Sequence, residues 1–520
     1  MNIASIKPYI PDGAAVELNG NRATFEVSAK HLVEVANSLY QNENLQLLTI
    51  TATDERHAGG GYIIWYVFGA PKEHAVIIPY LVLKNTEEFP SLSLIIHEAW
   101  NYERQIRTFF GLIPVGHPDP RPINLHENWP ADVFPLRKDV DWKIRPEIAH
   151  GSYQFQVVEG EGIYEIPVGP IHAGIIEPGH FRFSVAGEEI VLLEPKLGYT
   201  HKGSEKLFEQ LPLNDKVKLS EKISGDSSFS HSLAFCQAAE QLADVTVPTR
   251  ALYLRTIYAE LERLANHFGD IGAMMLDTGY SFGGAHGARL REMVMQINGR
   301  LSGSRFLRGV NALGGVTKDI EDGISLSADL EKIKKDFSEV LAIAEDCSSL
   351  VNRLQDTGVL TPSNAAEHGL TGMAARAVGI VTDARIDYPY AAYKDVPLHV
   401  IETELAGDAQ ARFHVRTKEV IASMDIVQRA LREMPQGPII ATTDITFKEN
   451  AIAVSIVEGW RGEIVYFLET DKHGTISRVA PRDPSFINWS AVGGAGVGNM
   501  VPDFPLINKS FNLSYTGYDL

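Results

Sequence analysis

The first part of the chain alternates between apolar and polar positions in a way that predicts a small mixed domain. Residues 45–57 and 62–69 alternate and are rich in β-branched and aromatic side chains, so we expect two paired strands. Residues 74–84 predict a further strand. Residues 91–111 place their charges on one face of a helical pattern and predict a helix.

An irregular stretch follows this predicted helix. The prolines of residues 116–139 exclude regular structure across that segment. A loop of this length inside a compact domain is usually a binding or docking surface. Residues 139–154 then predict a linker to a second unit, which starts near Tyr153.

The second unit begins with strands and continues mainly with helices. Residues 164–203 predict two or three strands separated by Gly and Pro turns. Helical periodicity and start signals then predict helices over residues 204–211, 231–247, 248–275, 288–303 and 327–355. Alternation returns and predicts strands over residues 437–447, 451–460 and 462–470. We therefore expect an α+β chain, with an α/β domain over residues 1–150 and a mainly helical domain with small sheets over residues 151–520.

Composition narrows the partners and the compartment. The chain of 520 residues carries 47 Lys and Arg against 66 Asp and Glu, a formal net charge of -19, which argues against nucleic-acid binding. Its two cysteines, Cys236 and Cys347, cannot build a disulfide framework or a self-contained iron–sulfur cluster. The sequence shows neither a signal-peptide pattern nor an apolar run long enough to span a membrane, so we expect a cytoplasmic chain.

Several motifs resemble those of one group of redox complexes. Residues 1–150 resemble the 30-kDa-type subunit of respiratory complex I in the motifs NYERQIRTFFGL, GHPDPRPINL and PLRKD. Residues 151–520 resemble the 49-kDa-type subunit of complex I and the large subunit of energy-converting, membrane-bound nickel–iron hydrogenases. The motifs concerned are IPVGPIHAGIIEPGHFRF, GYTHKGSEKLFE, SGDSSFSH, LERLANH, GSRFLRGVNALGGV and TGMAARAVGI. The fusion of both parts resembles the large subunit of formate hydrogenlyase-type (group 4) hydrogenases.

The resemblance also implies where a metal centre would lie, and the chain departs from the hydrogenase pattern there. Nickel–iron hydrogenases hold their metals with two Cys-x-x-Cys pairs, whose positions here are Ser224 and Ser227, then Ser485 and Asn488. A neutral hydroxyl or amide does not replace a bridging thiolate. We therefore expect no metal bound by this chain, but a polar cavity lined by these residues and Asp226 that suits a small polar ligand or ordered water.

Complex I has likewise lost the metal centre, and its resemblance implies a quinone in the same cavity. In that family a histidine and a tyrosine hold the quinone head group. His172 matches the histidine, and His180 aligns ambiguously because it follows a hydrogenase-like insertion. No tyrosine stands at the matching position near Gly225 and Asp226. Quinone remains an alternative ligand, and the missing tyrosine argues against the complex I binding mode.

Glu177 stands where the hydrogenase relatives place a proton-relay glutamate. If it is buried beside His172, His180 and His231, it titrates near neutral pH, as a proton pathway needs. The alternative is a solvated turn residue before a proline. Asp226 has a similar alternative, because the segment SGDSS opens a predicted helix and its side chains can cap exposed N–H groups.

Four polar residues, Glu262, Arg263, His267 and Asp270, fall on neighbouring turns of one predicted helix. The favoured interpretation is a structural network in which they pair with one another. The alternative follows from the resemblance, since the relatives use this region as part of a charged path toward membrane subunits. Arg376, in the TGMAARAVGI match, is a candidate for a cation that faces the cavity.

The resemblance implies a peripheral-arm subunit of a membrane-bound, ion-translocating oxidoreductase complex that is not itself a hydrogenase. An adjacent small subunit would carry the nearest iron–sulfur cluster, and antiporter-like membrane subunits would move the ion, with this chain peripheral on the cytoplasmic face. Two alternatives stay open: a quinone-binding subunit of the NADH:quinone oxidoreductase type, and a non-catalytic scaffold that docks through residues 116–139.

Overall fold

The N-terminal part of the chain is built on one twisted sheet. The structure is a computed structural model that describes residues 14–42, 45–400, 402–441 and 445–520. The sheet has the strand order β1-β2-β5-β4-β3, and its strands are β1 (Val16–Asn19), β2 (Arg22–Glu26), β3 (Gln46–Asp54), β4 (Tyr62–Ala70) and β5 (Ala75–Leu83). β3 pairs antiparallel with β4, and β2 pairs parallel with β5. The predicted strands over residues 45–57, 62–69 and 74–84 are confirmed.

The helix predicted over residues 91–111 is wrong in its first third. α3 spans only Ala99–Phe110, and residues 91–98 form turns. The buried carboxylate of Glu103 accepts hydrogen bonds from Ser91 Oγ, Leu92 N and Ser93 Oγ, at 2.5–2.6 Å. These side-chain bonds hold the turn in place of a further helical turn. The remaining elements of this part are α2 (Ala29–Asn37), β6 (Glu88–Pro90) and β7 (Ile113–Val115).

The irregular segment 116–139 packs largely against the second part of the same chain. Asn124 Nδ2 donates to Asp519 O at 3.3 Å, His126 Nε2 lies 3.1 Å from Leu197 O, and Lys138 Nζ donates to Ser477 O at 2.6 Å. Much of the predicted docking surface is therefore an internal interface. Trp142, just beyond it, stays 44% exposed.

Two small sheets bring the second part together. One has the order β10-β9-β8, formed by β8 (Ile163–Val168), β9 (His180–Ala186) and β10 (Glu189–Lys196). The other has the order β13-β14-β15, formed by β13 (Ile452–Glu458), β14 (Glu463–Thr470) and β15 (Ile476–Arg482). The strand predicted over residues 437–447 is wrong for the residues that the structure describes, since these form only an isolated bridge between Gly315 and Ile440.

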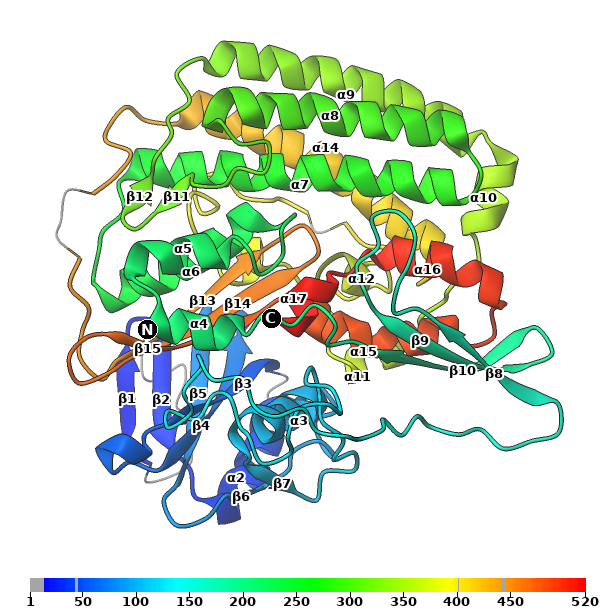
Figure 1. Ribbon diagram of the computed structural model, residues 1–520. Helices are drawn as coiled ribbons and strands as arrows, with labels where there is room; N and C mark the ends of the chain where they lie inside the picture. The colour runs from blue at the N-terminus through cyan, green and yellow to red at the C-terminus, as the bar shows by residue number, and fades with distance from the viewer. Residues whose placement is uncertain (1–13, 43–44, 401, 442–444) are drawn as a thin grey trace.

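Helices account for most of the regular structure of the second part. Its four longest helices, α7, α8, α9 and α14, lie in layers on the side away from the N-terminal sheet (Figure 1). The helices are α4 (Ser204–Gln210), α5 (Leu213–Ser220), α6 (Ser228–Leu242), α7 (Thr249–Asp277), α8 (Ser281–Ser302), α9 (Gly323–Glu345), α10 (Ser348–Leu354), α11 (Pro362–Glu367), α12 (Gly372–Arg376), α13 (Ala384–Asp387), α14 (Ala409–Glu433), α15 (Pro484–Gly496), α16 (Phe504–Phe511) and α17 (Tyr515–Asp519). The helix predicted over residues 327–355 is interrupted between α9 and α10. Across the described ranges, no helix combines the length and apolar character needed to cross a bilayer.

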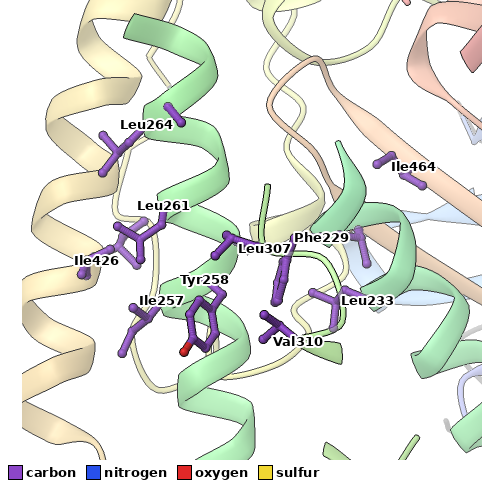
Figure 2. Close-up of a cluster of buried hydrophobic side chains, with 14 of the residues drawn as sticks. Phe229, Leu233, Ile257, Tyr258, Leu261, Leu264, Leu307, Val310, Ile426 and Ile464 are labelled. Atoms are coloured by element: carbon purple, nitrogen blue, oxygen red, sulfur yellow. The ribbon is translucent and has the colours of Figure 1, made fainter. Parts of the chain in front are cut away.

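The largest apolar core lies between α6, α7 and α14. Phe229 of α6 faces Tyr258 of α7, with ring centroids 5.8 Å apart, whereas Ile257 and Leu261 of α7 point toward Ile426 of α14 (Figure 2). All five side chains are buried. A separate apolar cluster joins the N-terminal sheet to the β13-β14-β15 sheet, where the rings of Trp65 and Phe467 lie 5.6 Å apart. The first cluster holds the long helices together, and the second holds the two sheets against each other.

Candidate functional site

A cavity of about 610 Å³ lies between the β8–β9 loop, one face of α7 and the C-terminal segment 505–516. The α7 positions in its wall recur every three or four residues, as expected for one face of a helix: Asn266, Gly269, Asp270, Ala273, Leu276 and Asp277. The loop contributes residues 173–177, and the segment before α6 contributes residues 224–226. The wall therefore combines polar and apolar side chains.

An arginine–aspartate pair lies in the wall of the cavity. Arg461 donates from Nη1 and Nη2 to the two carboxylate oxygens of Asp226, at 2.7 and 2.6 Å. Burial would raise the pKa of Asp226, but the guanidinium outweighs it and holds this pKa below its usual value. Ser224 Oγ donates to Asp226 Oδ1 at 2.9 Å. Asp226 is thus an ion-pair partner and not a helix cap.

Ser224 and Ser485 converge on one residue, Ser514. Ser224 Oγ lies 2.9 Å from Ser514 Oγ, and Ser514 N donates to Ser485 Oγ at 2.9 Å. Asn488 is fully buried, and its amide exchanges two hydrogen bonds with the backbone of Thr371, at 3.0 and 3.1 Å. Of the predicted cavity lining, Ser224 and Asp226 reach the cavity. Ser227, Ser485 and Asn488 lie behind its surface, so that part of the predicted lining is wrong.

His231 does not reach the cavity either. Its Nε2 lies 2.9 Å from Asp483 Oδ2 and its Nδ1 lies 3.1 Å from Tyr466 Oη, with the ring fully buried. Asp483 also accepts a hydrogen bond from Ser485 N at 2.7 Å and so caps α15. His231 is therefore fully engaged in the core.

Glu177 lines the cavity, but it does not form the expected cluster with the histidines. Its carboxylate accepts a hydrogen bond from Thr516 N at 3.2 Å, and the side chain is half-buried. His172 Nε2 lies 2.7 Å from Gly179 O, within the β8–β9 loop. His180 Nδ1 lies 3.4 Å from Gly169 O, and burial lowers the pKa of its ring. The glutamate and the histidines each have separate partners.

Arg376 faces a buried network and not the cavity. It pairs with Glu419 at 2.8 Å, with Glu458 at 3.0 Å and with Asp383 at 3.3 Å. All four residues are at most 5% exposed in their side chains. The predicted cavity-facing cation is therefore replaced by Arg461, more than two hundred residues away in sequence from its partner Asp226.

Comparison with known families gives two matches in sequence order. Residues 25–146 match the respiratory-chain NADH dehydrogenase 30 Kd subunit, and residues 277–452 match the respiratory-chain NADH dehydrogenase 49 Kd subunit. The chain is 33% identical to hydrogenase-4 component G of Escherichia coli K12, over 99% of this chain and 92% of the relative. It is 30% identical to formate hydrogenlyase subunit 5 of the same organism, over 96% of this chain and 89% of that relative. The chain belongs to the family of fused 30-kDa/49-kDa-type subunits.

Relatives of this family are also found in complex I-like and respiratory membrane assemblies. The C/D subunit of the NADH-quinone oxidoreductase of Phocaeicola vulgatus is 30% identical over 86% of this chain and 89% of its own length. The solved structure of a membrane-bound sulfane sulfur reductase, an archaeal respiratory membrane complex, contains a chain of the same fold, with a TM-score of 0.65 and 25% identity. The match covers 69% of this chain and 99% of that one.

In this member of the family Glu262, Arg263, His267 and Asp270 of α7 do not pair with one another, contrary to the favoured interpretation, but with groups outside this set. Glu262 accepts hydrogen bonds from Phe229 N at 2.6 Å and Ser230 N at 3.0 Å, and burial raises its pKa to about 7. His267 Nε2 lies 2.7 Å from a carboxylate oxygen of Glu419 on α14. The other pairs are Arg263 with Glu260 and Glu419, and Asp270 with Arg416. These contacts form a buried charged zone between α7 and α14.

Two residues of the site, Arg461 and Ser514, were not predicted from the sequence. Arg461 stands in the turn of EGWRGE between β13 and β14, far along the chain from the motif it binds. Ser514 lies in the C-terminal segment, for which the sequence predicts no role. The position of an arginine between two strongly apolar strands is the only pattern that singles out Arg461. Within the described ranges, no group of three His, Cys, Asp or Glu residues has the arrangement of a metal site.

Proposed function

We propose that this chain is the large peripheral-arm subunit of a membrane-bound, ion-translocating oxidoreductase complex whose reactive site is the cavity itself and not a nickel–iron centre. The observation that carries this proposal is the position of the Arg461 guanidinium. Its Nη1 lies 3.4 Å from Ser224 Oγ and 3.5 Å from Ser227 Oγ, two of the four positions that the resemblance implies as metal ligands.

The residues at these positions do not fit a nickel–iron cluster. A cation already lies against Ser224 and Ser227, and it would repel a second positive centre. Both oxygens of Asp226 are engaged by the guanidinium, and the Asn488 amide is engaged by the Thr371 backbone. Neutral hydroxyl and amide groups also lack the soft anionic character that bridging ligands need. No step of the reaction is therefore assigned to such a cluster.

Electrons would reach the cavity from another subunit. The two cysteines of this chain are too few for an iron–sulfur cluster, which needs four thiolates. Cys236 is buried in α6 and neither cysteine lines the cavity. A small iron–sulfur subunit beside the cavity would therefore supply the electron.

Proton movement away from the cavity would use the buried charges of α7 and α14. Asp270 in the cavity wall pairs with Arg416 of α14, and His267 contacts Glu419 one helical turn farther. Burial and the adjacent Asp383 raise the pKa of Glu458, which pairs with Arg376 in the same zone. A carboxyl group whose pKa is raised in this way can exchange a proton nearer neutral pH, as coupling to antiporter-like membrane subunits on the cytoplasmic face requires.

A quinone remains the second candidate ligand, because the cavity wall contains apolar side chains and a tyrosine at a different place from the family's. The apolar side chains include Ile175, Ile176 and Leu276. Tyr515 reaches the cavity from the C-terminal segment, and its hydroxyl accepts a hydrogen bond from Asn508 Nδ2 at 3.2 Å.

One purification tests both functions. The complex is isolated in detergent from its native membranes, its subunits are identified by mass spectrometry, and nickel is measured per chain beside a nickel–iron hydrogenase as positive control. We expect an iron–sulfur subunit and membrane subunits without stoichiometric nickel. Stoichiometric nickel, or a chain that copurifies with no membrane subunit, contradicts the proposal. Decylubiquinone reduction that is lost in His172→Ala and kept in the control His286→Ala, at a histidine outside the cavity lining, would favour the quinone function.

A further inference from the structure

Most charged groups in the cavity wall have an opposite charge beside them. Asp226 binds Arg461, and Asp270 accepts hydrogen bonds from Arg416 Nε at 3.0 Å and Asn512 Nδ2 at 2.7 Å. These two carboxylates are therefore neutralised from within the protein. They offer no surplus charge to a molecule that enters the cavity.

The remaining acidic groups of the wall are compensated as well. Glu177 accepts a hydrogen bond from Thr516 N and lies close enough to Lys202 to favour the charged form of that lysine. Burial raises the pKa of Asp277, which disfavours its charged form, and the nearby Lys509 opposes this shift only in part. Every carboxylate that lines the cavity thus has a cation near it.

Arg291 is different. It lines the cavity from α8 and is half-buried. Its side chain forms neither a hydrogen bond nor an ion pair within the part of the chain that the structure describes. Its near neighbour on α8, Arg289, instead pairs with Asp336 at 2.9 Å. Arg291 therefore gives the cavity one uncompensated positive charge.

The fold makes room for this arginine. Arg291 lies across Gly269 of α7, where an added Cβ would come within 2.9 Å of Arg291 Cδ and 3.2 Å of its Nε. A side chain at position 269 would push the guanidinium away from its present course. The absence of a side chain at Gly269 thus allows the Arg291 side chain of α8 to pass over α7 and reach the cavity.

We propose that Arg291 is the binding cation for a small, soft monoanion in the cavity. This inference rests on the proposed function, in which the cavity holds a ligand. A guanidinium is weakly hydrated and forms strong charge-assisted hydrogen bonds, so it pairs well with a polarizable anion. The apolar Leu276 and Ile176 in the same wall favour an anion with a weak hydration shell over a strongly hydrated one.

Thiocyanate and hydrosulfide are the probes for this site. Their binding to the intact purified complex is measured by titration calorimetry for the wild type and three variants. Arg291→Gln removes the charge, Arg291→Lys keeps it, and Arg305→Gln removes an exposed α8-proximal arginine that does not line the cavity. We expect binding to weaken about tenfold to a hundredfold in Arg291→Gln, because a hydrogen-bonded charge is lost. Arg291→Lys retains most of the affinity, and Arg305→Gln matches the wild type.

Equal affinity in Arg291→Gln and the wild type overturns the inference. It is also overturned if the wild-type complex binds neither anion at millimolar concentration, or if it binds neutral decylubiquinone and no anion. The melting temperature of each variant shows that the fold is intact, and Arg291→Lys provides a folded variant if Arg291→Gln does not assemble. If the wild-type chain does not copurify with membrane subunits, the proposed function is contradicted instead. Mass spectrometry of the copurifying proteins detects this outcome independently of anion binding.

Discussion

At the scale of single residues, the cavity wall shows how buried polar groups are satisfied at a distance in sequence. The N-cap residue of α6, Ser227, makes no side-chain capping bond. Glu262 of α7 caps the helix instead. Its carboxylate accepts hydrogen bonds from Phe229 N, Ser230 N and Ser230 Oγ in the first turn of α6. A negative charge at a helix N-terminus is favourable, but full burial of this carboxylate opposes its ionisation.

The balance at Glu262 predicts a specific pH dependence of stability. Burial raises the folded-state pKa to about 7 from an ordinary value of 4.5. The contribution of this group is therefore fully present below pH 4.5 and is lost as the pH rises through 7. We expect the melting temperature of the wild type to fall between pH 5 and pH 8 by more than that of Glu262→Gln, which carries no titrating group.

The control for this experiment is Glu292→Gln, an exposed glutamate of α8. Its pH profile is expected to follow the wild type. If the profiles of Glu262→Gln and the wild type run parallel from pH 5 to pH 8, Glu262 keeps an ordinary pKa and the buried-acid account is wrong.

The sequence could indicate only part of this site. The motif SGDSS placed Ser224 and Asp226 at the cavity because they lie within one short segment. Arg461 was missed because it meets Asp226 across 235 positions, and no local pattern records such a contact. The sequence also does not show whether a side chain reaches the cavity surface. Ser485 and Asn488 were therefore expected in the lining, but they lie buried behind it.

At the scale of elements, a start signal identified a helix that buries several charges, since Pro248 and Thr249 mark the beginning of α7. α7 was predicted almost to its ends, over residues 248–275 against Thr249–Asp277. α14 was not predicted, since Arg412, Arg416 and Glu419 are charged and yet nearly or fully buried. Charges that pair inside the protein blur the amphipathic pattern from which a helix is predicted.

The contact between α7 and α8 predicts opposite effects for two glycines of α8. A Cβ at Gly287 would lie 2.4 Å from Gly272 Cα of α7, so Gly287→Ala forces the helices apart. We expect a loss of about 1–3 kcal/mol in the free energy of unfolding, the usual cost of overpacking. At Gly299 the nearest atom would be Arg305 Cγ at 4.0 Å, and Gly299→Ala should gain up to about 1 kcal/mol through lower chain entropy.

Chemical denaturation of both variants beside the wild type measures these changes. Gly287→Ala with wild-type stability would mean that the helices can separate without loss, and the close packing would not be a determinant of the fold. The paired design separates packing from helix propensity, because both substitutions replace glycine by alanine within one helix.

At the scale of the whole molecule, the two parts of the chain share their cores. Leu48, Trp65 and Val67 of the N-terminal sheet cluster with Val465 and Phe467 of β14. Arg478 of β15 adds polar contacts, donating to Ala52 O at 3.0 Å and to Glu205 at 2.7 Å. Alternation along the strands predicted the sheets and the α+β class. It could not predict which sheet packs on which, because an apolar face does not identify the element that covers it.

This shared core predicts that the chain unfolds as one unit and that Trp65 stabilises both parts. Trp65 is 7% exposed, packs on Phe467 and donates from Nε1 to Thr53 Oγ1 at 3.2 Å. Trp65→Ala should lower the free energy of unfolding by about 3–5 kcal/mol, because it leaves a cavity between the sheets. Trp142→Ala, at a 44% exposed tryptophan, should change it by less than about 1 kcal/mol.

Calorimetry distinguishes a shared core from two independent domains. We expect a single transition in the wild type that moves as a whole to lower temperature in Trp65→Ala and hardly moves in Trp142→Ala. Two transitions, of which only the first responds to Trp65→Ala, would mean that residues 1–150 fold apart from the rest. The sheet contact would then be a docking surface between domains, and the cavity, which lies entirely within residues 173–516, would not depend on it.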